Sequence, residues 1–280
     1  MAEFKSFYKE VASGEGQRCH YATRLDTYGC GCAHDCSYCY AKSLLDFRKM
    51  WNPMCPSVAD IRKIERRLDK VEKGSVLRLG GMTDCFQECE RTHGVTLKTI
   101  EAMNERGIGY LIVTKSDLVA DDKYIEVMDK DLAHIQITVT CLDDDFYFDK
   151  KYEKAPAPSK RVGAIKKLQD NGFDVAIRLS PLMEEYMDFD KLNGLGIEKG
   201  VVEFLRVNHW IRQWFDVDYS KYTVKEGGYN HLPLEEKIRV IKKIEGMELT
   251  VCEDVTSHYN YWKFHFNPNK DDCCNLKFSN

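Results

Sequence analysis

Short apolar runs alternate with segments of helical periodicity over most of the sequence, and this alternation constrains the fold more than any other feature. Runs typical of buried strands lie at residues 76–79, 110–113, 135–139, 175–177, 201–207 and 249–251. Helical segments lie at residues 95–103, 124–128, 159–168 and 233–244, and Ser159 is expected to cap the third of them. Connections of helix length join parallel strands. The order therefore predicts an α/β fold, a full or partial parallel barrel of TIM type, with a doubly wound sheet as the rival.

The length of 280 residues fits one such domain. We assign residues 1–255 to the barrel and residues 256–280 to a C-terminal tail that packs on it. No stretch approaches eighteen consecutive apolar residues, and residues 1–9 lack a signal pattern, so we expect a cytoplasmic protein with no membrane partner. The net charge of −4 argues against a protein that coats nucleic acid, although a local basic groove stays open.

Four of the twelve cysteines, Cys30, Cys32, Cys36 and Cys39, stand close together in residues 28–41 (YGCGCAHDCSYCYA). In a reducing compartment, clustered cysteines are more often metal ligands than disulfides. Cys32, Cys36 and Cys39 have C-x3-C-x2-C spacing, so their thiolates can converge on one tight loop and bind an iron–sulfur cluster. Three ligands leave one iron of a [4Fe–4S] cube open for a substrate or cofactor. The alternatives are idle buried cysteines and a structural zinc site whose fourth ligand is one of Cys30, His34, Cys85 and Cys89.

With Tyr38 before the third cysteine, this spacing resembles that of the radical S-adenosylmethionine (SAM) superfamily, in which such an aromatic residue lies beside the adenine of SAM. Further segments resemble the spore photoproduct lyase-like family, whose members are often labelled DNA repair photolyases. In chain order these segments are residues 82–90 (MTDCFQECE), 111–116 (LIVTKS), 153–161 (EKAPAPSKR) and 179–182 (LSPL). The resemblance thus covers residues 28–182 in order, and little is recognised beyond residue 200.

The resemblance implies a partial (β/α)6 barrel with a C-terminal extension, in which the cluster loop (about residues 28–42) and SAM lie at the carboxyl ends of the strands. It also implies that the backbone of Gly80, Gly81 and Met82 receives the SAM amino group, because glycine permits close approach. An ordinary strand-to-loop turn explains the same glycines equally well.

Polar residues at the ends of the later strands are further candidates for SAM binding. Lys115 and Ser116 would meet the SAM carboxylate or a substrate phosphate, and a solvated lysine is the alternative. Thr138 and Thr140 would face the ribose, unless they only pack inward. Arg178, inside an apolar strand, needs a partner if it is buried, and the SAM carboxylate is one candidate. Asn208 follows the sixth strand, where members of the family often contact SAM.

The hydrogen donor of the resembled family is missing from its expected place. The family's lyases use a cysteine just before the Thr-Asp pair, where this chain has Gly81 and Met82. Cys85, on the other side of that pair, and Tyr40 are therefore the candidate hydrogen relays. His34 and Asp35 are expected to shape the cluster loop rather than to react. The departure leaves the repair reaction itself open.

Two other groups have weaker functional interpretations. Cys252, Cys273 and Cys274 could bind a second cluster or zinc, but idle buried thiols are more frequent. Trp210 and Trp214 flank Arg212 in the kind of aromatic-basic patch that stacks bases, and core or interface packing is the alternative.

Together these features predict an enzyme in which a [4Fe–4S] cluster gives one electron to SAM. The cleavage would yield methionine and a 5′-deoxyadenosyl radical, which abstracts hydrogen from a substrate. We expect a nucleic acid or nucleotide as substrate, with a peptide or small metabolite as the second choice. A flavodoxin or ferredoxin would supply the electron. A zinc-containing nucleic-acid-binding module is the alternative of another class.

Overall fold

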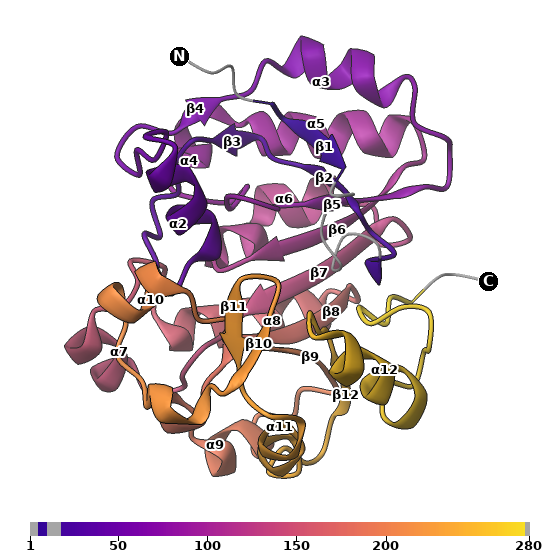
Figure 1. Ribbon diagram of the computed structural model, residues 1–280. Coiled ribbons are helices and arrows are strands. Elements are labelled where there is room, and N and C mark those ends of the chain that lie inside the picture. Colours follow the sequence, from indigo (N-terminus) through magenta and orange to yellow (C-terminus); the bar gives the residue numbers. More distant parts are fainter. Residues whose placement is uncertain (1–4, 10–17, 278–280) are drawn as a thin grey trace.

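The computed structural model describes residues 5–9 and 18–277 and is built around one eight-stranded sheet (Figure 1). Seven of the strands are parallel, and their order in the sheet follows their order in the chain. They are β2 (Thr23–Leu25), β5 (Val76–Leu79), β6 (Gly109–Thr114), β7 (Ala133–Thr138), β8 (Asp174–Leu182), β9 (Lys199–Phe204) and β12 (Glu248–Val251). β1 (Phe7–Lys9) adds to β2 in antiparallel orientation, and β12 forms the other edge, so the sheet is not closed. The fold is a partial parallel barrel, which agrees with the full or partial barrel that the alternation of elements predicts and with the partial barrel that the family resemblance implies.

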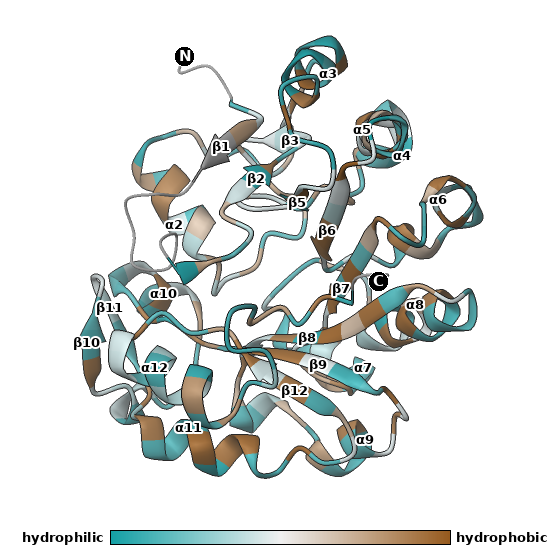
Figure 2. Cartoon of the chain, turned by 90° about the vertical axis from the view of Figure 1, so that its right-hand side faces the viewer, coloured by the Kyte–Doolittle hydropathy of each residue, from teal (hydrophilic) through white to brown (hydrophobic). Residues whose placement is uncertain are grey.

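Helices connect the strands and cover the convex side of the sheet. Figure 2 shows α3, α5, α6 and α8 along the outside of the arc of strands. The helices are α2 (Tyr40–Phe47), α3 (Ile61–Leu68), α4 (Glu90–His93), α5 (Val95–Glu105), α6 (Asp122–Val127), α7 (Asp144–Lys150), α8 (Pro158–Asp170), α9 (Phe189–Asn193), α10 (His209–Trp214), α11 (Leu234–Ile241) and α12 (Thr256–His265). Short 3-10 turns lie at Asp117–Ala120, Glu184–Tyr186 and Tyr219–Lys221. Two small strand pairs complete the structure: β3 (Tyr28–Gly29) with β4 (Ser57–Val58), and β10 (Val224–Glu226) with β11 (Tyr229–His231).

The side chains of each parallel strand alternate between the helical layer and the interior of the arc, as the two-residue period of a strand requires. On β5, Leu77 and Leu79 are buried in the main hydrophobic core, whereas Arg78 between them lines a cavity on the concave side. On β8, Ile177 and Leu179 pack in the same core, and Arg178 lines the cavity. The polar residues in otherwise apolar strands therefore mark the inner wall of the barrel.

Several predicted boundaries are wrong in detail. α8 begins at Pro158 with Ala157 as its N-cap, so Ser159 is not the cap; its Oγ donates to Asp144 instead. The strand predicted at residues 201–207 ends at Phe204, and Val207 forms a separate bridge with Asn230. The segment assigned to the C-terminal tail, residues 256–280, starts with the helix α12, in which Trp262 is buried; its assignment as a separate tail stays a prediction.

Segments from the two ends of the chain meet beside the sheet. The hydroxyl of Tyr21 donates to Oδ2 of Asp272 at 2.7 Å, and both residues are buried. Cys19, Cys273 and Cys274 pack in the same small hydrophobic cluster as Tyr21. Arg18 donates to the carbonyl of Asp254 at 2.6 Å. Among the described residues, no helix combines the length and apolarity needed to cross a bilayer.

Candidate active site

A tight loop between β3 and α2 carries the three cysteines of the C-x3-C-x2-C motif. Gly31 is required there, because a Cβ at this position would lie 2.0 Å from the carbonyl oxygen of Asn52. Cys30 and Asp35 adopt positive φ angles of 56° and 41°, and both are non-glycine residues in the left-handed region. Cys39 is the N-cap of α2, and its sulfur accepts the backbone N–H of Lys42 at 3.4 Å. The loop is thus held in one compact shape by local geometry.

Residues from two other segments anchor the loop. Gln87 accepts the N–H of Ala33 at 2.9 Å and donates to the carbonyl of Gly31 at 3.3 Å. The N–H of Ser37 donates to the carbonyl of Tyr152 at 2.8 Å, and the N–H of Lys154 donates to the carbonyl of His34. These bonds fix the loop to the segments that follow β5 and α7.

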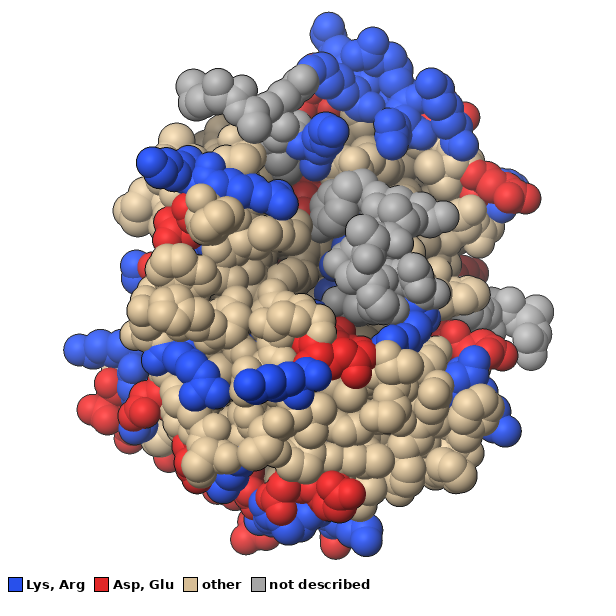
Figure 3. All heavy atoms as spheres, viewed as in Figure 1, with Lys and Arg blue, Asp and Glu red and all other residues tan. Residues whose placement is uncertain are grey.

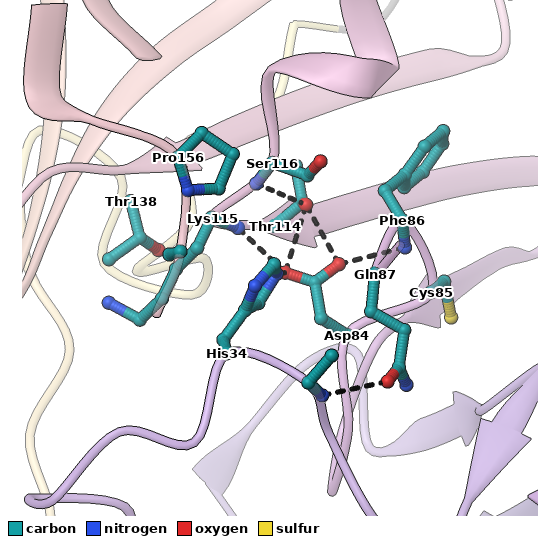
Figure 4. Close-up of polar contacts among 12 residues, drawn as sticks. His34, Asp84, Cys85, Phe86, Gln87, Thr114, Lys115, Ser116, Thr138 and Pro156 are labelled. Carbon is teal, nitrogen blue, oxygen red and sulfur yellow. Dashed lines mark hydrogen bonds and ion pairs between the residues drawn. The ribbon is translucent and has the colours of Figure 1, made fainter. Parts of the chain in front are cut away.

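The carboxylate of Asp84 is the centre of a buried network at the ends of β5 and β6 (Figure 4). Its Oδ2 lies 3.1 Å from Nε2 of His34 and accepts the N–H of Lys115 at 2.7 Å. Its Oδ1 accepts the hydroxyl of Thr114 and the N–H of Phe86, both at 2.8 Å. Burial raises the pKa of Asp84, but His34 and the donated hydrogen bonds outweigh it and lower the pKa below its ordinary value. Asp84 therefore stays ionised and binds the cluster loop to the barrel.

A second buried carboxylate, Glu153, organises the surroundings of Tyr38. The Tyr38 hydroxyl donates to Glu153, and Nζ of Lys115 lies 2.7 Å from that hydroxyl and 3.2 Å from Glu153 Oε2. Arg161, fully buried, forms an ion pair with the other carboxylate oxygen. Burial alone would raise the pKa of Glu153, but Arg161 and Lys115 hold it well below its usual range. Lys115 is thus a paired, half-buried cation and not the solvated surface lysine of the alternative.

A cavity of about 180 Å³ lies between the cluster loop and the carboxyl ends of β5 to β9. Most of the predicted site residues line it together: Cys32, Cys36, Tyr38, Cys39, Tyr40, Gly80, Gly81, Met82, Lys115, Thr138 and Arg178. This position agrees with the rule that sites of parallel barrels lie at the carboxyl ends of the strands.

The three loop cysteines lie around this cavity, Cys36 buried and Cys32 and Cys39 half-buried. Burial is the largest cause that raises the pKa of Cys32, of Cys36 and of Cys39. Metal binding would therefore release protons from all three thiols, since thiolates are the ligands. Within residues 5–9 and 18–277, no three His, Cys, Asp or Glu side chains converge on a point that suits a single metal ion. The loop cysteines thus surround a cavity, and neither they nor Cys252, Cys273 and Cys274 form the compact arrangement of a zinc site.

The segment Gly80 to Met82 forms one wall of the cavity and is held by Asp26, which follows β2. The Asp26 carboxylate accepts the N–H groups of Gly81 at 2.7 Å and of Met82 at 3.0 Å. Gly80 has a φ of +87°, and a Cβ there would lie 2.8 Å from the carbonyl oxygen of Val113. The hydroxyl of Tyr40 donates to the carbonyl of Gly81 at 2.9 Å. Only glycine fits at position 80, because of its positive φ and the nearby Val113 carbonyl; contact of this backbone with SAM stays a prediction.

Arg178 is buried and paired, as a charge inside an apolar strand must be. It donates to Gln136 Oε1 and to Glu203 Oε2, each at 2.7 Å. Glu203 also contacts Arg206 at 3.0 Å, and both Glu203 and Arg206 line the cavity. Burial opposes ionisation of Glu203, but Arg206 and Arg178 lower its pKa to about 2. Sequence reasoning missed Asp26 and Glu203. The one available signal was a carboxylate inside or directly after an apolar strand.

Four predicted site residues do not line the cavity. Ser116 accepts the N–H of Leu118 at the start of a 3-10 turn, and Asn208 caps α10 and donates to Ser43 at 3.1 Å. Thr140 bonds the hydroxyl of Tyr152 at 3.0 Å. Cys85 is buried with its sulfur 3.6 Å from the carbonyl of Leu25, and Figure 4 shows it pointing away from the Asp84 network. Their side chains serve packing and caps in this structure.

Comparison with known proteins adds evidence about the family and the fold. A family model described as the radical SAM superfamily matches residues 27–190. An uncharacterized protein of Methanocaldococcus jannaschii is 26% identical over 230 residues, which are 76% of this chain and 83% of that protein. A spore photoproduct lyase mutant with bound AdoMet and dinucleoside spore photoproduct has a similar fold, with a TM-score of 0.64, 14% identity, and coverage of 85% of this chain and 78% of that one. Streptococcus suis SuiB, bound to precursor peptide SuiA, is similar with a TM-score of 0.50, 15% identity, and coverage of 78% and 44%.

Proposed function

Because the chain belongs to the radical SAM superfamily, we propose that it is an enzyme that binds a [4Fe–4S] cluster through Cys32, Cys36 and Cys39 and uses SAM to modify a nucleic acid or nucleotide. The observation that carries the proposal is the shared cavity. Three thiols from one loop line it together with the glycine segment that follows β5. Thiolates are the ordinary ligands of iron–sulfur clusters, and three of them leave one iron open.

The chemistry of the donor set fits both the cluster and SAM. The three loop cysteines would supply the sulfur ligands, and at Gly80 a side chain would clash with the Val113 carbonyl. With both groups bound, the cluster and SAM supply a carbon-centred radical able to take hydrogen from an unreactive C–H bond. The protein itself would bind the cluster and SAM, orient the substrate and exclude water from the cavity.

Particular residues would carry these tasks. Asp26 fixes the backbone of Gly81 and Met82 by accepting both N–H groups, so the wall against SAM is rigid. Lys115 and Glu153 hold the ring of Tyr38 beside the cluster loop. Of the two proposed hydrogen relays, Tyr40 lines the cavity and Cys85 does not, which favours Tyr40.

The cations of the cavity wall support an anionic substrate such as a nucleotide. Among the described residues, Arg78, Lys115, Arg178 and Arg206 line the cavity as cations, and Asp84 and Glu203 line it as acids. Lys115 is paired with Glu153, and Arg178 and Arg206 share Glu203. The fold similarity to a lyase that holds a dinucleoside substrate supports the same class. A peptide substrate is the second candidate, supported by the weaker similarity to SuiB with its precursor peptide. A flavodoxin or ferredoxin is the proposed electron donor.

The test is anaerobic reconstitution with iron and sulfide, followed by reduction with dithionite in the presence of SAM. We expect a brown protein that forms 5′-deoxyadenosine, detected by chromatography. Cys36→Ala should abolish this product. Absence of 5′-deoxyadenosine from the wild type, or its full retention in Cys36→Ala, would refute the proposal. Incubation with dinucleoside spore photoproduct, and separately with peptides, then distinguishes the two substrate classes.

A further inference from the structure

An exposed apolar and aromatic surface covers α2 and α10 beside the cavity. Its members are Leu44 and Phe47 of α2, Met54 of the following loop, and Trp210 and Trp214 of α10; we call it the α2–α10 face. Phe47 is 74% exposed, Met54 86% and Trp210 38%. Large apolar side chains grouped in this way mark interaction sites.

The aromatic rings of this face are held in place. The rings of Trp210 and Trp214 are stacked, with centroids 6.0 Å apart and planes 27° apart. Nζ of Lys42, on α2, lies 5.1 Å from the Trp214 ring centroid. Asn208, the cap of α10, donates to Ser43 of α2, so the two helices are linked. One indole of a fixed pair remains open to solvent.

The surroundings of the face are basic, although the chain as a whole is acidic. Residues 40–56 and 205–215 contain five Lys or Arg and one Asp, against totals of 41 basic and 45 acidic residues. Two of the five are paired, Lys42 with Asp35 and Arg206 with Glu203 and Asp254, which leaves three cations for a partner. Arg48, Lys49 and Arg212 are exposed, and none of them has an ion pair in the described part of the chain. Figure 3 shows Lys and Arg side chains on both sides of the uncharged area over these helices. An anionic partner therefore fits this surface.

The face is continuous with the mouth of the cavity. Tyr40 and Ala41, the first residues of α2, line the cavity. Leu205 and Arg206 line it as well, and α10 begins three residues after Arg206. A polymer that lies on the face can therefore enter the cavity with one of its units.

We propose that the α2–α10 face binds single-stranded nucleic acid next to the unit held in the cavity. Open aromatic rings bind unpaired bases by stacking, and neighbouring Lys and Arg bind the phosphates. A duplex covers the faces of its bases, so it cannot use the rings in this way. The inference rests on the proposed function for its substrate class, but it concerns a surface outside the cavity and is tested by binding alone.

The test uses the full reconstituted chain and a fluorescent single-stranded oligothymidylate of about ten nucleotides, with binding followed by anisotropy under argon. Trp210→Ala should weaken binding about 5-fold or more, and Trp210→Phe should restore most of it. Phe264→Ala removes an aromatic ring of α12 that is 57% exposed, against 38% for Trp210, and is the control, expected to bind as the wild type does. Three phosphate contacts predict a slope of about −2 for log K against log salt, and Arg212→Gln should reduce it by about 0.7.

Three results would overturn the inference: equal binding by Trp210→Ala and the wild type, equal affinity for a duplex of the same sequence, or slower reduction of Trp210→Ala by flavodoxin but not by dithionite. The last result would assign the face to a protein reductant. Formation of 5′-deoxyadenosine without oligonucleotide is measured separately. Failure of binding with intact SAM cleavage therefore rejects this surface and leaves the proposed activity in place.

Discussion

His34 of the cluster loop and Asp84 after β5 are joined by a contact of 3.1 Å between Nε2 and Oδ2. Both side chains are buried, and the same carboxylate accepts hydrogen bonds from Thr114 and Lys115 at the end of β6. One side chain therefore connects the loop that carries the cysteines to two neighbouring strands. The position of the cysteines depends on this network as much as on their own spacing.

Asp84→Asn should loosen the cluster loop, because an amide cannot accept all the hydrogen bonds that the carboxylate accepts. We expect the free energy of unfolding to fall by about 2–4 kcal/mol and iron retention to fall with it. Urea unfolding and iron analysis after reconstitution measure the two effects. Asp46→Asn, at an exposed position of α2, is the control. Normal iron content in Asp84→Asn would show that the loop holds its shape without the network.

Gly80→Ala should be more damaging than the same change at another glycine of similar backbone conformation. Gly228 has a φ of +83° and no atom within 4 Å of the point where a Cβ would lie, whereas at Gly80 the carbonyl oxygen of Val113 is 2.8 Å from that point. We expect Gly228→Ala to cost about 1–2 kcal/mol from the left-handed backbone alone, and Gly80→Ala about 3 kcal/mol. SAM affinity, measured by equilibrium dialysis, should fall only in Gly80→Ala. Equal losses of stability in both variants would mean that the backbone around Gly80 and Val113 moves and relieves the clash.

Cys30→Ser and Cys39→Ser should separate cluster ligands from the neighbouring thiol. Cys30 is absent from the cavity lining, whereas Cys39 belongs to it. Reconstituted wild type and Cys30→Ser should hold about four irons per chain, and Cys39→Ser should lose most of its iron and its visible absorbance. An equal loss of iron from Cys30→Ser would favour the alternative in which Cys30 is a fourth metal ligand, as in a structural zinc site.

The pair of Glu203 with Arg178 and Arg206 should make stability fall in acid. The folded-state pKa of Glu203 is lowered to about 2, so its contribution is present above the ordinary glutamate pKa and is lost as pH falls toward 2. The contribution of the ionised Glu203 to the free energy of unfolding is about 3 kcal/mol. In urea unfolding, the wild type should have a higher free energy of unfolding than Glu203→Gln near neutral pH, and this difference should shrink as pH falls toward 2. An advantage that stays constant would contradict the ionised pair.

The sequence was informative where local chemistry decides the structure. Six apolar runs predict strands that the sheet contains, because parallel strands buried on both faces need nearly continuous apolar residues. β2 was not predicted, since it is only three residues long and holds Arg24 facing an interior that is polar. The hairpin of β10 and β11 was also missed, because its residues are half exposed and carry no clear alternation.

The same distinction between local and long-range features holds for the candidate site. The cysteine loop, Gly80 and Lys115 were recognisable from spacing and position along the chain. Asp26 and Glu203 were not, because their roles depend on partners 55 and 25 residues away. Cys85 looked suitable by its place next to Thr83 and Asp84. A turn that begins with the Phe86 N–H on Asp84 carries its sulfur to the opposite side.

The hydrogen bond between Tyr21 and Asp272 has a consequence for synthesis on the ribosome. The two residues are 251 positions apart, so at about 5–20 residues per second the first waits about 10 to 50 s for the second. During that interval the cluster loop has emerged, but Lys115 and Glu153, which enclose its tyrosine, arrive only later. A nascent chain therefore offers its cysteines to iron, oxygen or assembly factors before the barrel can bury them.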